Sequence, residues 1–368
     1  MERLFASDVM TKRERVEAAL NLQPVDRVPI LEQLSYNARV IADWTGKDIR
    51  GFEYTVDDVC AVIRQTTDLA MPPVVPCGTA RVTTEDGFVY QNDNWTSWRV
   101  SRPFTTAEGA RDWLSGRTEG LLASPVDAAR ERAAYREYVV DLQAKIGETV
   151  LLKYHDLGFC AAFDTMGLEL FTYLVYDYPE VFGEYMAASA ARALAWAQAV
   201  ADRELSPVVL IAEDFATKQG PIFPPDFLAR YHLPYVERAA TAWHDAGVKV
   251  LYHSDGNYRA TVPDLIACGV DGFYCLEPAV GMDIVELKRT WPGMVWSGGV
   301  DGVDLMERGT PQQVRAEVQR QIRETSALQA GGMIVASSSE INPPIPAANF
   351  RAMVEAVGEM RSGCRERG

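Results

Sequence analysis

The chain has 368 residues, which at about 150 residues per domain allows one large domain or two modest ones. Hydrophobic residues make up 48% and charged residues 24%, so the composition excludes a disordered, collagen-like or coiled-coil protein. The net charge of −15 disfavours nucleic acid and anionic membrane surfaces as partners. Because the sequence has no signal-like N-terminus and no run of about 18 apolar residues, it indicates a cytoplasmic protein.

The chain begins with signals for one helix and two short strands. Thr11 and Glu14 have the spacing of a capping box, which predicts a helix that continues to Leu20. Apolar runs at 28–31 and 68–75 are short and flanked by charged or polar residues, so both are predicted to be buried strands.

A change of pattern follows. A turn signal at 85–87 lies between aromatic and β-branched residues, which predicts an inserted antiparallel β-hairpin over about 80–102. The stretch 106–145 is rich in Ala, Arg and Glu and is predicted to form peripheral helices.

From residue 150 onward, apolar runs alternate with helical segments. One of those helices starts at a capped Thr310 with Pro311 in its first turn. Such alternation indicates a parallel sheet, and six runs plus the two earlier strands make eight, the number of a TIM (β/α)8 barrel. We therefore predict an α/β fold in which residues 1–368 form a single TIM-barrel domain. The six runs are 150–153, 207–212, 248–252, 272–276, 294–297 and 333–336.

Polar residues follow most of the predicted strands, and in a barrel these positions open onto one shared face. The candidates for catalysis are His253, Asp255, Glu213, Asp214, Asp68 and His155. The candidates for substrate binding are Glu32, Tyr154, Lys218, Tyr252, Glu277 and Asp301.

The sharpest local pattern is His253-Ser-Asp255-Gly256, directly after an apolar strand. An imidazole and a carboxylate two residues apart on a loop can converge on one divalent cation, and Glu340 after the last strand is a candidate third ligand. The alternative is that Asp255 caps the next helix and His253 only hydrogen-bonds a neighbouring strand.

Glu213 and Asp214 are adjacent, and adjacent residues at a strand end point to opposite sides. One carboxylate should therefore enter the site while the other meets the surrounding helices, but the sequence leaves open which one does so. A salt bridge to Lys218 is a further alternative for this pair.

A series of motifs in a fixed order resembles the uroporphyrinogen decarboxylase superfamily, which contains porphyrinogen decarboxylases and corrinoid-dependent methyltransferases built as TIM barrels. The resemblance runs over nearly the whole chain. Its motifs are Lys12–Leu20, Asp26-Arg-Val-Pro29, Glu213–Pro221, Pro225-Asp-Phe227, His253–Asn257, Leu276-Glu-Pro278, Gly298-Gly-Val-Asp301, Gly309-Thr-Pro311 and Pro346-Ala-Ala-Asn349.

Departures from the family patterns separate its branches. Asp68 resembles the catalytic aspartate of the decarboxylases, but of their cationic segment after the first strand only Arg39 remains here. The net charge of −15 also opposes a substrate with many carboxylates. The methyltransferase branch binds zinc through a His-x-Cys pair and a later Cys. His253 matches that histidine, whereas Asp255 and Ser339 replace the cysteines, so the resemblance implies an oxygen-rich shell without a thiolate.

The resemblance implies a methyltransferase-like enzyme that moves a methyl group from a small O-methylated (or related) substrate to the cobalt of a separate corrinoid protein. Zinc or another divalent metal, held by His253, Asp255 and Glu340, would assist O-demethylation. A homodimer is compatible with the family. The alternatives are a decarboxylase or lyase of a small carboxylic acid, with Asp68 and His155 as acid and base and no corrinoid, and a noncatalytic ligand-binding barrel.

Overall fold

The computed structural model describes residues 4–338 and 340–362. Its parallel strands form two hydrogen-bonded groups, and each strand lies at or within about three residues of a run predicted from the sequence. The first group has the order β1-β2-β6 and the second the order β14-β13-β12-β11-β8-β7. Their bounds are β1 Leu31–Glu32, β2 Leu69–Ala70, β6 Val150–Leu151, β7 Lys153–His155, β8 Val208–Ala212, β11 Lys249–His253, β12 Gly272–Tyr274, β13 Val295–Val300 and β14 Met333–Ser337.

The two groups of strands are joined at both edges. Only Leu152 separates β6 from β7, so one extended segment pairs with both groups. At the other edge a parallel bridge links Ile30, just before β1, to Val335 in β14. All the pairings within and between the groups are parallel, so the carboxyl ends of the strands lie at one edge.

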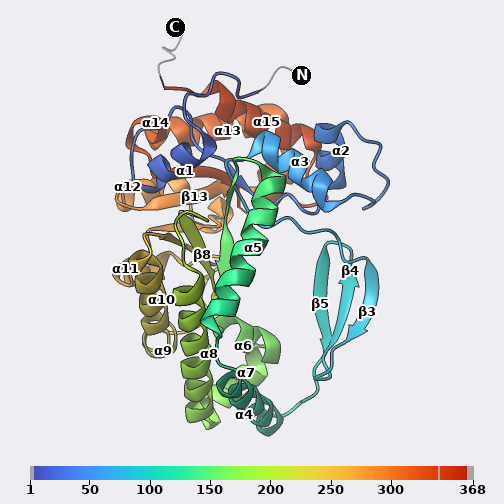
Figure 1. Ribbon diagram of the computed structural model, residues 1–368, viewed down its shortest axis with the longest axis vertical. Coiled ribbons are helices and arrows are strands. Elements are labelled where there is room, and N and C mark those ends of the chain that lie inside the picture. The colour runs from blue at the N-terminus through green and yellow to red at the C-terminus, as the bar shows by residue number, and fades with distance from the viewer. Residues whose placement is uncertain (1–3, 339, 363–368) are drawn as a thin grey trace.

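Helices follow most of the parallel strands and pack around them (Figure 1). Capping boxes at Thr11 and Thr310 confirm the two helix starts predicted from the sequence. The α-helices are α1 Lys12–Leu20, α2 Ala38–Thr45, α3 Val56–Thr66, α4 Ala107–Ala123, α5 Ala128–Ile146, α6 Phe159–Met166, α7 Leu168–Asp177, α8 Pro179–Val200, α9 Pro225–Tyr231, α10 Leu233–Asp245, α11 Val262–Ala267, α12 Ile284–Thr290, α13 Pro311–Glu324, α14 Ala327–Ala330 and α15 Ala347–Glu359. The other helical turns are η1 Arg259–Thr261, η2 Pro278–Val280 and η3 Gly302–Glu307.

A separate antiparallel sheet of three strands lies to the side of the molecule, away from the parallel strands (Figure 1). It comprises β3 Thr79–Thr83, β4 Val89–Asp93 and β5 Thr96–Ser101, in the region where the sequence predicts a hairpin. Arg99 in β5 contacts Asp164 in α6 and so connects this sheet to the helices. A short hairpin, β9 Ala216–Thr217 with β10 Gly220–Pro221, follows β8.

Buried apolar side chains form two clusters that correspond to the two faces of the parallel strands. The smaller cluster takes alternate residues from the strands, such as Val208, Leu210 and Leu251, and we call this the inner face. The larger cluster contains the intervening residues, such as Val209 and Val250, together with the helices, and this is the outer face. This alternation decides where each polar residue at a strand end points.

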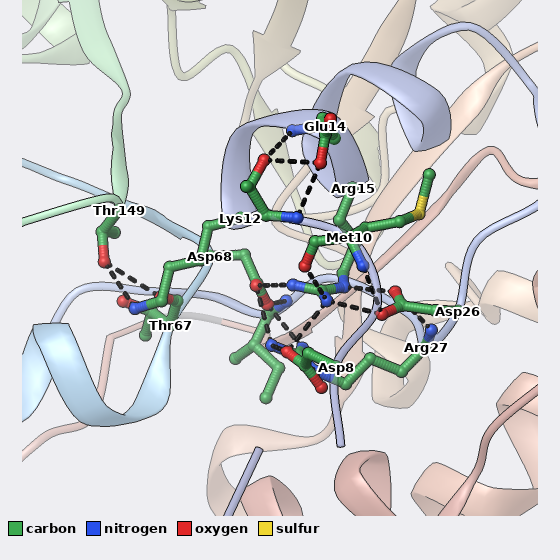
Figure 2. A network of polar contacts seen from close by, with 12 residues as sticks. Asp8, Met10, Lys12, Glu14, Arg15, Asp26, Arg27, Thr67, Asp68 and Thr149 are labelled. Carbon is green, nitrogen blue, oxygen red and sulfur yellow. Dashed lines mark hydrogen bonds and ion pairs between the residues drawn. The ribbon is translucent and has the colours of Figure 1, made fainter. Parts of the chain in front are cut away.

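A buried network of charges joins the N-terminal segment to the amino ends of the strands (Figure 2). Asp68, which immediately precedes β2, accepts hydrogen bonds from Arg15 at 2.8 Å and from Arg27 at 2.7 and 2.8 Å. Arg15 also pairs with Asp26 and with Asp8. The side chains of Asp68, Arg15 and Arg27 are all buried, so each charge needs its partners to offset the loss of hydration.

Within the described residues, no helix combines the length and the apolar character needed to cross a membrane.

Candidate functional site

The strand register brings three segments together at the carboxyl edge. His253 ends β11 and pairs in register with Ala212 of β8 on one side and Tyr274 of β12 on the other. Asp214 lies two residues beyond Ala212, and Cys275 directly follows Tyr274. The site is therefore built from three neighbouring strands whose ends are level.

His253, Asp255 and Cys275 are the described residues that could hold a metal ion. Their ligand atoms all lie within 4.8 Å of one another. The Nε2 of His253 is 3.8 Å from Oδ1 of Asp255, and the Sγ of Cys275 is 3.0 Å from the same oxygen. Zinc bonds of about 2.0–2.3 Å at tetrahedral angles place ligand atoms roughly 3.3–3.8 Å apart, so this nitrogen, oxygen and sulfur set has a spacing close to that of a zinc site.

Asp214 positions the imidazole of His253. Its Oδ1 lies 3.2 Å from Nδ1 of His253 and accepts a hydrogen bond from the amide of Asp255 at 2.8 Å. Burial alone would lower the pKa of His253, but the carboxylates of Asp214, Asp255 and Glu340 together raise it. In metal-binding histidines, one ring nitrogen typically contacts a carboxylate, and this contact directs the other ring nitrogen toward the metal.

Cys275 is the site residue that the sequence analysis missed. It is buried and has a φ of 67°, a left-handed conformation that non-glycine residues rarely adopt. Its sulfur lies within hydrogen-bond distance of both the Asp255 carboxylate and the carbonyl of Ser338, so its single S–H proton can be donated to either. Burial, followed by the Asp255 carboxylate, raises the pKa of Cys275 well above the ordinary value. The structure thus places a thiol beside His253 and Asp255, where the sequence analysis expected an oxygen-rich shell. Because Cys275 is 22 residues from His253 in the sequence, no short spacing links the two residues. The sequence signal that could have identified Cys275 was its position at the end of a strand.

The loop after His253 depends on one glycine. Gly256 has a φ of 79°, and a Cβ there would lie 2.7 Å from the carbonyl oxygen of Thr217 in β9. The amide of Gly256 donates to Glu277 at 2.6 Å. Glu277, expected to contact substrate, therefore fixes the turn that carries Asp255.

Alternation along β8 settles which of the two adjacent carboxylates faces the cluster. Asp214 is on the side of His253, whereas Glu213 points to the helices. The carboxylate of Glu213 accepts hydrogen bonds from the amides of Leu157 at 2.7 Å and Cys160 at 2.6 Å, at the start of α6. Burial, together with the neighbouring Asp156, raises the pKa of Glu213. Its role in the structure is to hold the loop between β7 and α6 against β8.

His155 and Tyr252 lie on the outer face and do not reach the cluster, because each is one residue out of phase with the inner-face positions. His155 is buried, its Nε2 contacts the carbonyl of Ala193 at 3.1 Å, and its Nδ1 accepts from Trp243 at 3.0 Å. Burial lowers the pKa of His155 to about 4. The hydroxyl of Tyr252 lies 2.6 Å from Nε2 of the buried His232. The structure thus places His155, expected to be catalytic, and Tyr252, expected to bind substrate, among outer-face partners and away from the His253 cluster.

Asp68 is at the opposite end of the strands from His253. It precedes β2, is fully buried, and has both carboxylate oxygens hydrogen-bonded to Arg15, to Arg27 and to the amide of Ile30. The arginines hold its pKa below the usual range against the effect of burial. Asp68, expected to be catalytic, thus lies within the arginine network at the amino ends of the strands and away from the His253 cluster.

Two further substrate candidates lie at the carboxyl edge. Glu32 at the end of β1 is buried and accepts from the amide and hydroxyl of Ser337 in β14, at 2.6 and 2.9 Å. Burial raises the pKa of Glu32 to about 8. Tyr154 lies on the inner face, is 38% exposed, and donates from its hydroxyl to Gln33 at 3.3 Å. Tyr154 is thus accessible at this edge, while Glu32 is enclosed.

The remaining candidates have different surroundings. Asp301 caps η3 by accepting from the amides of Val303 and Asp304, so its carboxylate is used locally. Lys218 is exposed at the turn between β9 and β10. Glu340 lies close enough to raise the pKa of His253 but is not part of the three-residue cluster. Ser339, at which the family resemblance places a metal ligand, lies outside the described residues.

The fold and the site together define an α/β protein with a parallel sheet and a polar cluster at the carboxyl edge of that sheet. The model of the uroporphyrinogen decarboxylase (URO-D) family matches residues 159–360, more than half of the chain. The chain therefore belongs to the URO-D family, and the matched region contains His253, Asp255 and Cys275.

Two solved structures are similar to the chain at low sequence identity, and the first of them shares its fold. A methyltransferase from Methanosarcina mazei is 17% identical with a TM-score of 0.66, over 95% of this chain and 99% of that one. A B12-independent methionine synthase from Shewanella sp. W3-18-1, solved in complex with selenomethionine, is 12% identical with a TM-score of 0.42, over 90% of this chain and 96% of that one. No curated protein sequence matches the chain.

Proposed function

We propose that residues 1–368 form a single TIM-barrel domain in which the two groups of parallel strands close into one eight-stranded barrel. The bridge between Ile30 and Val335 and the continuity of β6 with β7 support closure. When β6 and β7 are counted as one strand, the nine parallel strands become eight. The inner-face cluster is then the interior of the barrel. The His253 cluster then lies at the mouth, where catalytic residues of such barrels are found.

We further propose that the protein is a methyltransferase that moves a methyl group from a small O-methylated (or related) molecule to the cobalt of a corrinoid held by a separate protein. The observation that carries this proposal is the cluster of His253, Asp255 and Cys275, with Asp214 behind the imidazole. Family membership and the fold shared with the Methanosarcina mazei methyltransferase support it.

The donor set fits zinc, since imidazole, carboxylate and thiolate are its usual protein ligands. His253, Asp255 and Cys275 would hold it, and Glu340 remains a candidate for a fourth position. Bound zinc would supply a Lewis acid for the oxygen that loses the methyl group. Asp214 orients the imidazole, and the ring centroid of Tyr274, an inner-face residue, lies 5.5 Å from that of His253.

Elemental analysis of untagged protein is the first test. We expect near-stoichiometric zinc in the wild type, loss of the metal in His253→Ala and in Cys275→Ser, and no loss in His244→Ala. His244 is a matched control because it is a half-exposed histidine on α10 that pairs with Asp271. Wild-type protein that has been supplied with zinc and still contains none would refute the metal site.

A second measurement tests the reaction. Wild-type protein is incubated with cob(I)alamin and a panel of methoxylated small molecules, and the absorbance spectrum reports conversion to methylcobalamin. Conversion that requires one methoxylated compound, and that His253→Ala abolishes, is the expected result. Release of carbon dioxide from carboxylic acids without methylation would instead favour a decarboxylase, although neither Asp68 nor His155 lies near the cluster.

A further inference from the structure

A cavity of about 320 Å³ lies on the outer face of β7, in addition to the His253 cluster at the carboxyl edge. Its walls come from β7, α4, α8 and the start of α6. Lys153 and His155 line it and belong to the outer face, because they alternate with Leu152 of the inner-face cluster. The volume falls at the lower end of the range of about 300–1,000 Å³ typical of small-molecule sites.

Three cationic residues line this cavity: Lys153 from β7, Arg117 from α4 and Arg192 from α8. Within the part of the chain that the structure describes, none of them has a carboxylate partner at ion-pair distance, although the whole chain has a net charge of −15. One guanidinium nitrogen of Arg192 donates to the carbonyl of Ser124, and the Lys153 Nζ lies 5.1 Å from the ring centroid of Tyr138. These contacts position the cations without neutralising them.

The cavity has one carboxylate, Asp156, and that group is already engaged. Its Oδ1 accepts a hydrogen bond from the amide of Gly158 at 2.6 Å, and it lies beside Glu213. The charge balance of the lining is therefore positive toward α4 and α8, in contrast to the acidic chain as a whole. A concave positive site in an acidic protein selects anions.

The rest of the lining is aromatic or apolar. Trp196 packs on the ring of His155 with a centroid distance of 5.5 Å, and Tyr185 lies on the same helix as Trp196. His155 contributes no charge, because Trp243 donates to its Nδ1 and its remaining N–H donates to the carbonyl of Ala193. Neutral rings and cationic side chains thus line the cavity together, since α8 supplies both Trp196 and Arg192 and β7 supplies both His155 and Lys153.

We propose that this cavity binds a small carboxylate with an aromatic body, with its carboxylate on Arg117, Arg192 and Lys153 and its ring against Trp196. Planar guanidinium groups pair with carboxylates through two parallel hydrogen bonds, and an aromatic wall adds contact area for the ring. Inorganic phosphate offers charge without that contact and is expected to bind more weakly. The proposal is independent of methyl transfer, since it rests on residues outside the His253 cluster.

Calorimetric titration of the full chain with benzoate tests the proposal. Arg117→Gln and Lys153→Gln are each expected to weaken benzoate binding about tenfold or more, since a hydrogen bond to a charged group is worth about 1.5–3 kcal/mol. Arg130→Gln is the matched control, because this arginine on α5 has an exposed side chain and does not line the cavity. Thermal unfolding of every variant shows whether it remains folded.

Two comparisons locate the bound molecule. Benzamide, which has the same shape without the charge, is expected to bind at least about tenfold more weakly than benzoate. His253→Ala is expected to leave benzoate affinity unchanged. The proposal is overturned if the wild type does not bind benzoate, if phosphate binds more tightly than benzoate, if the two lining variants bind like the control, or if His253→Ala abolishes binding.

Discussion

Replacing Asp68 with asparagine removes the central anion of the network in Figure 2. The carboxylate receives three hydrogen bonds from Arg15 and Arg27 and one from the amide of Ile30, with lengths from 2.7 to 2.9 Å. In Asp68→Asn the shape is retained, but one oxygen becomes an NH₂ group that faces guanidinium donors. Two buried arginines then lose a charge partner, and Arg15 and Arg27 keep only Asp8 and Asp26 nearby.

The expected loss of stability is about 3–5 kcal/mol, the usual cost of removing one partner from a buried ion pair. A domain stability of about 5–15 kcal/mol would fall by a third or more in many cases. Urea unfolding followed by circular dichroism measures this change. The control is Asp304→Asn, where the carboxylate is 71% exposed and pairs with Arg308 at 3.0 Å. That change is expected to cost no more than about 0.5 kcal/mol.

A cost below about 1 kcal/mol for Asp68→Asn would refute the reasoning that the network is a strongly coupled buried unit. The activity of the folded fraction gives an independent check. Because Asp68 lies at the amino ends of the strands, folded Asp68→Asn should retain its methyl-transfer rate. A large loss of rate at unchanged stability would restore the catalytic assignment made from the sequence.

Acid should weaken the same network. Against the effect of burial, Arg27 and Arg15 hold the pKa of Asp68 below its usual range, and Arg15 with the amides of Met10 and Val9 does the same for the pKa of Asp26. A depressed carboxylate pKa contributes stability that is present above the unfolded value of about 3.9 and is lost as pH falls through the folded value. We expect the urea midpoint to fall steadily below about pH 4, with a smaller fall in Asp68→Asn. Equal falls in both proteins would contradict this assignment.

Three further substitutions test the site and its supports. Gly256→Ala should destabilise the protein by about 1–3 kcal/mol, because the φ of Gly256 is positive and the added Cβ meets a backbone carbonyl. The control Gly116→Ala in α4 has open space around the added Cβ and should stabilise the protein by about 0.5–1 kcal/mol. Thermal unfolding measures both changes, and equal effects would refute the steric argument. Tyr252→Phe should cost about 1–3 kcal/mol by leaving a buried histidine nitrogen without its partner, with zinc content unchanged; loss of zinc would contradict its outer-face position. Asp214→Asn should weaken zinc affinity about 10- to 100-fold in a competition titration, and unaltered affinity would exclude it as the orienting carboxylate.

Local patterns in the sequence determined the order of strands and helices. The apolar runs and the capping signals at Thr11 and Thr310 act between residues close in the chain, so they can be read without coordinates. The same applies to His253 and Asp255, which sit two residues apart at a strand end, and to the motifs that place the chain in the URO-D family.

Only the tertiary structure decided which side chains meet. Cys275 joins His253 because β12 lies beside β11 with Tyr274 opposite His253, a relation that no short spacing encodes. Asp214, and not Glu213, is on the side of His253 because side chains alternate along β8 and β8 pairs in register with β11. Asp68 precedes β2, so its carboxylate lies at the amino ends of the strands and away from the cluster. In each case the outcome depends on strand register, and a shift of one residue in register turns every side chain to the opposite face.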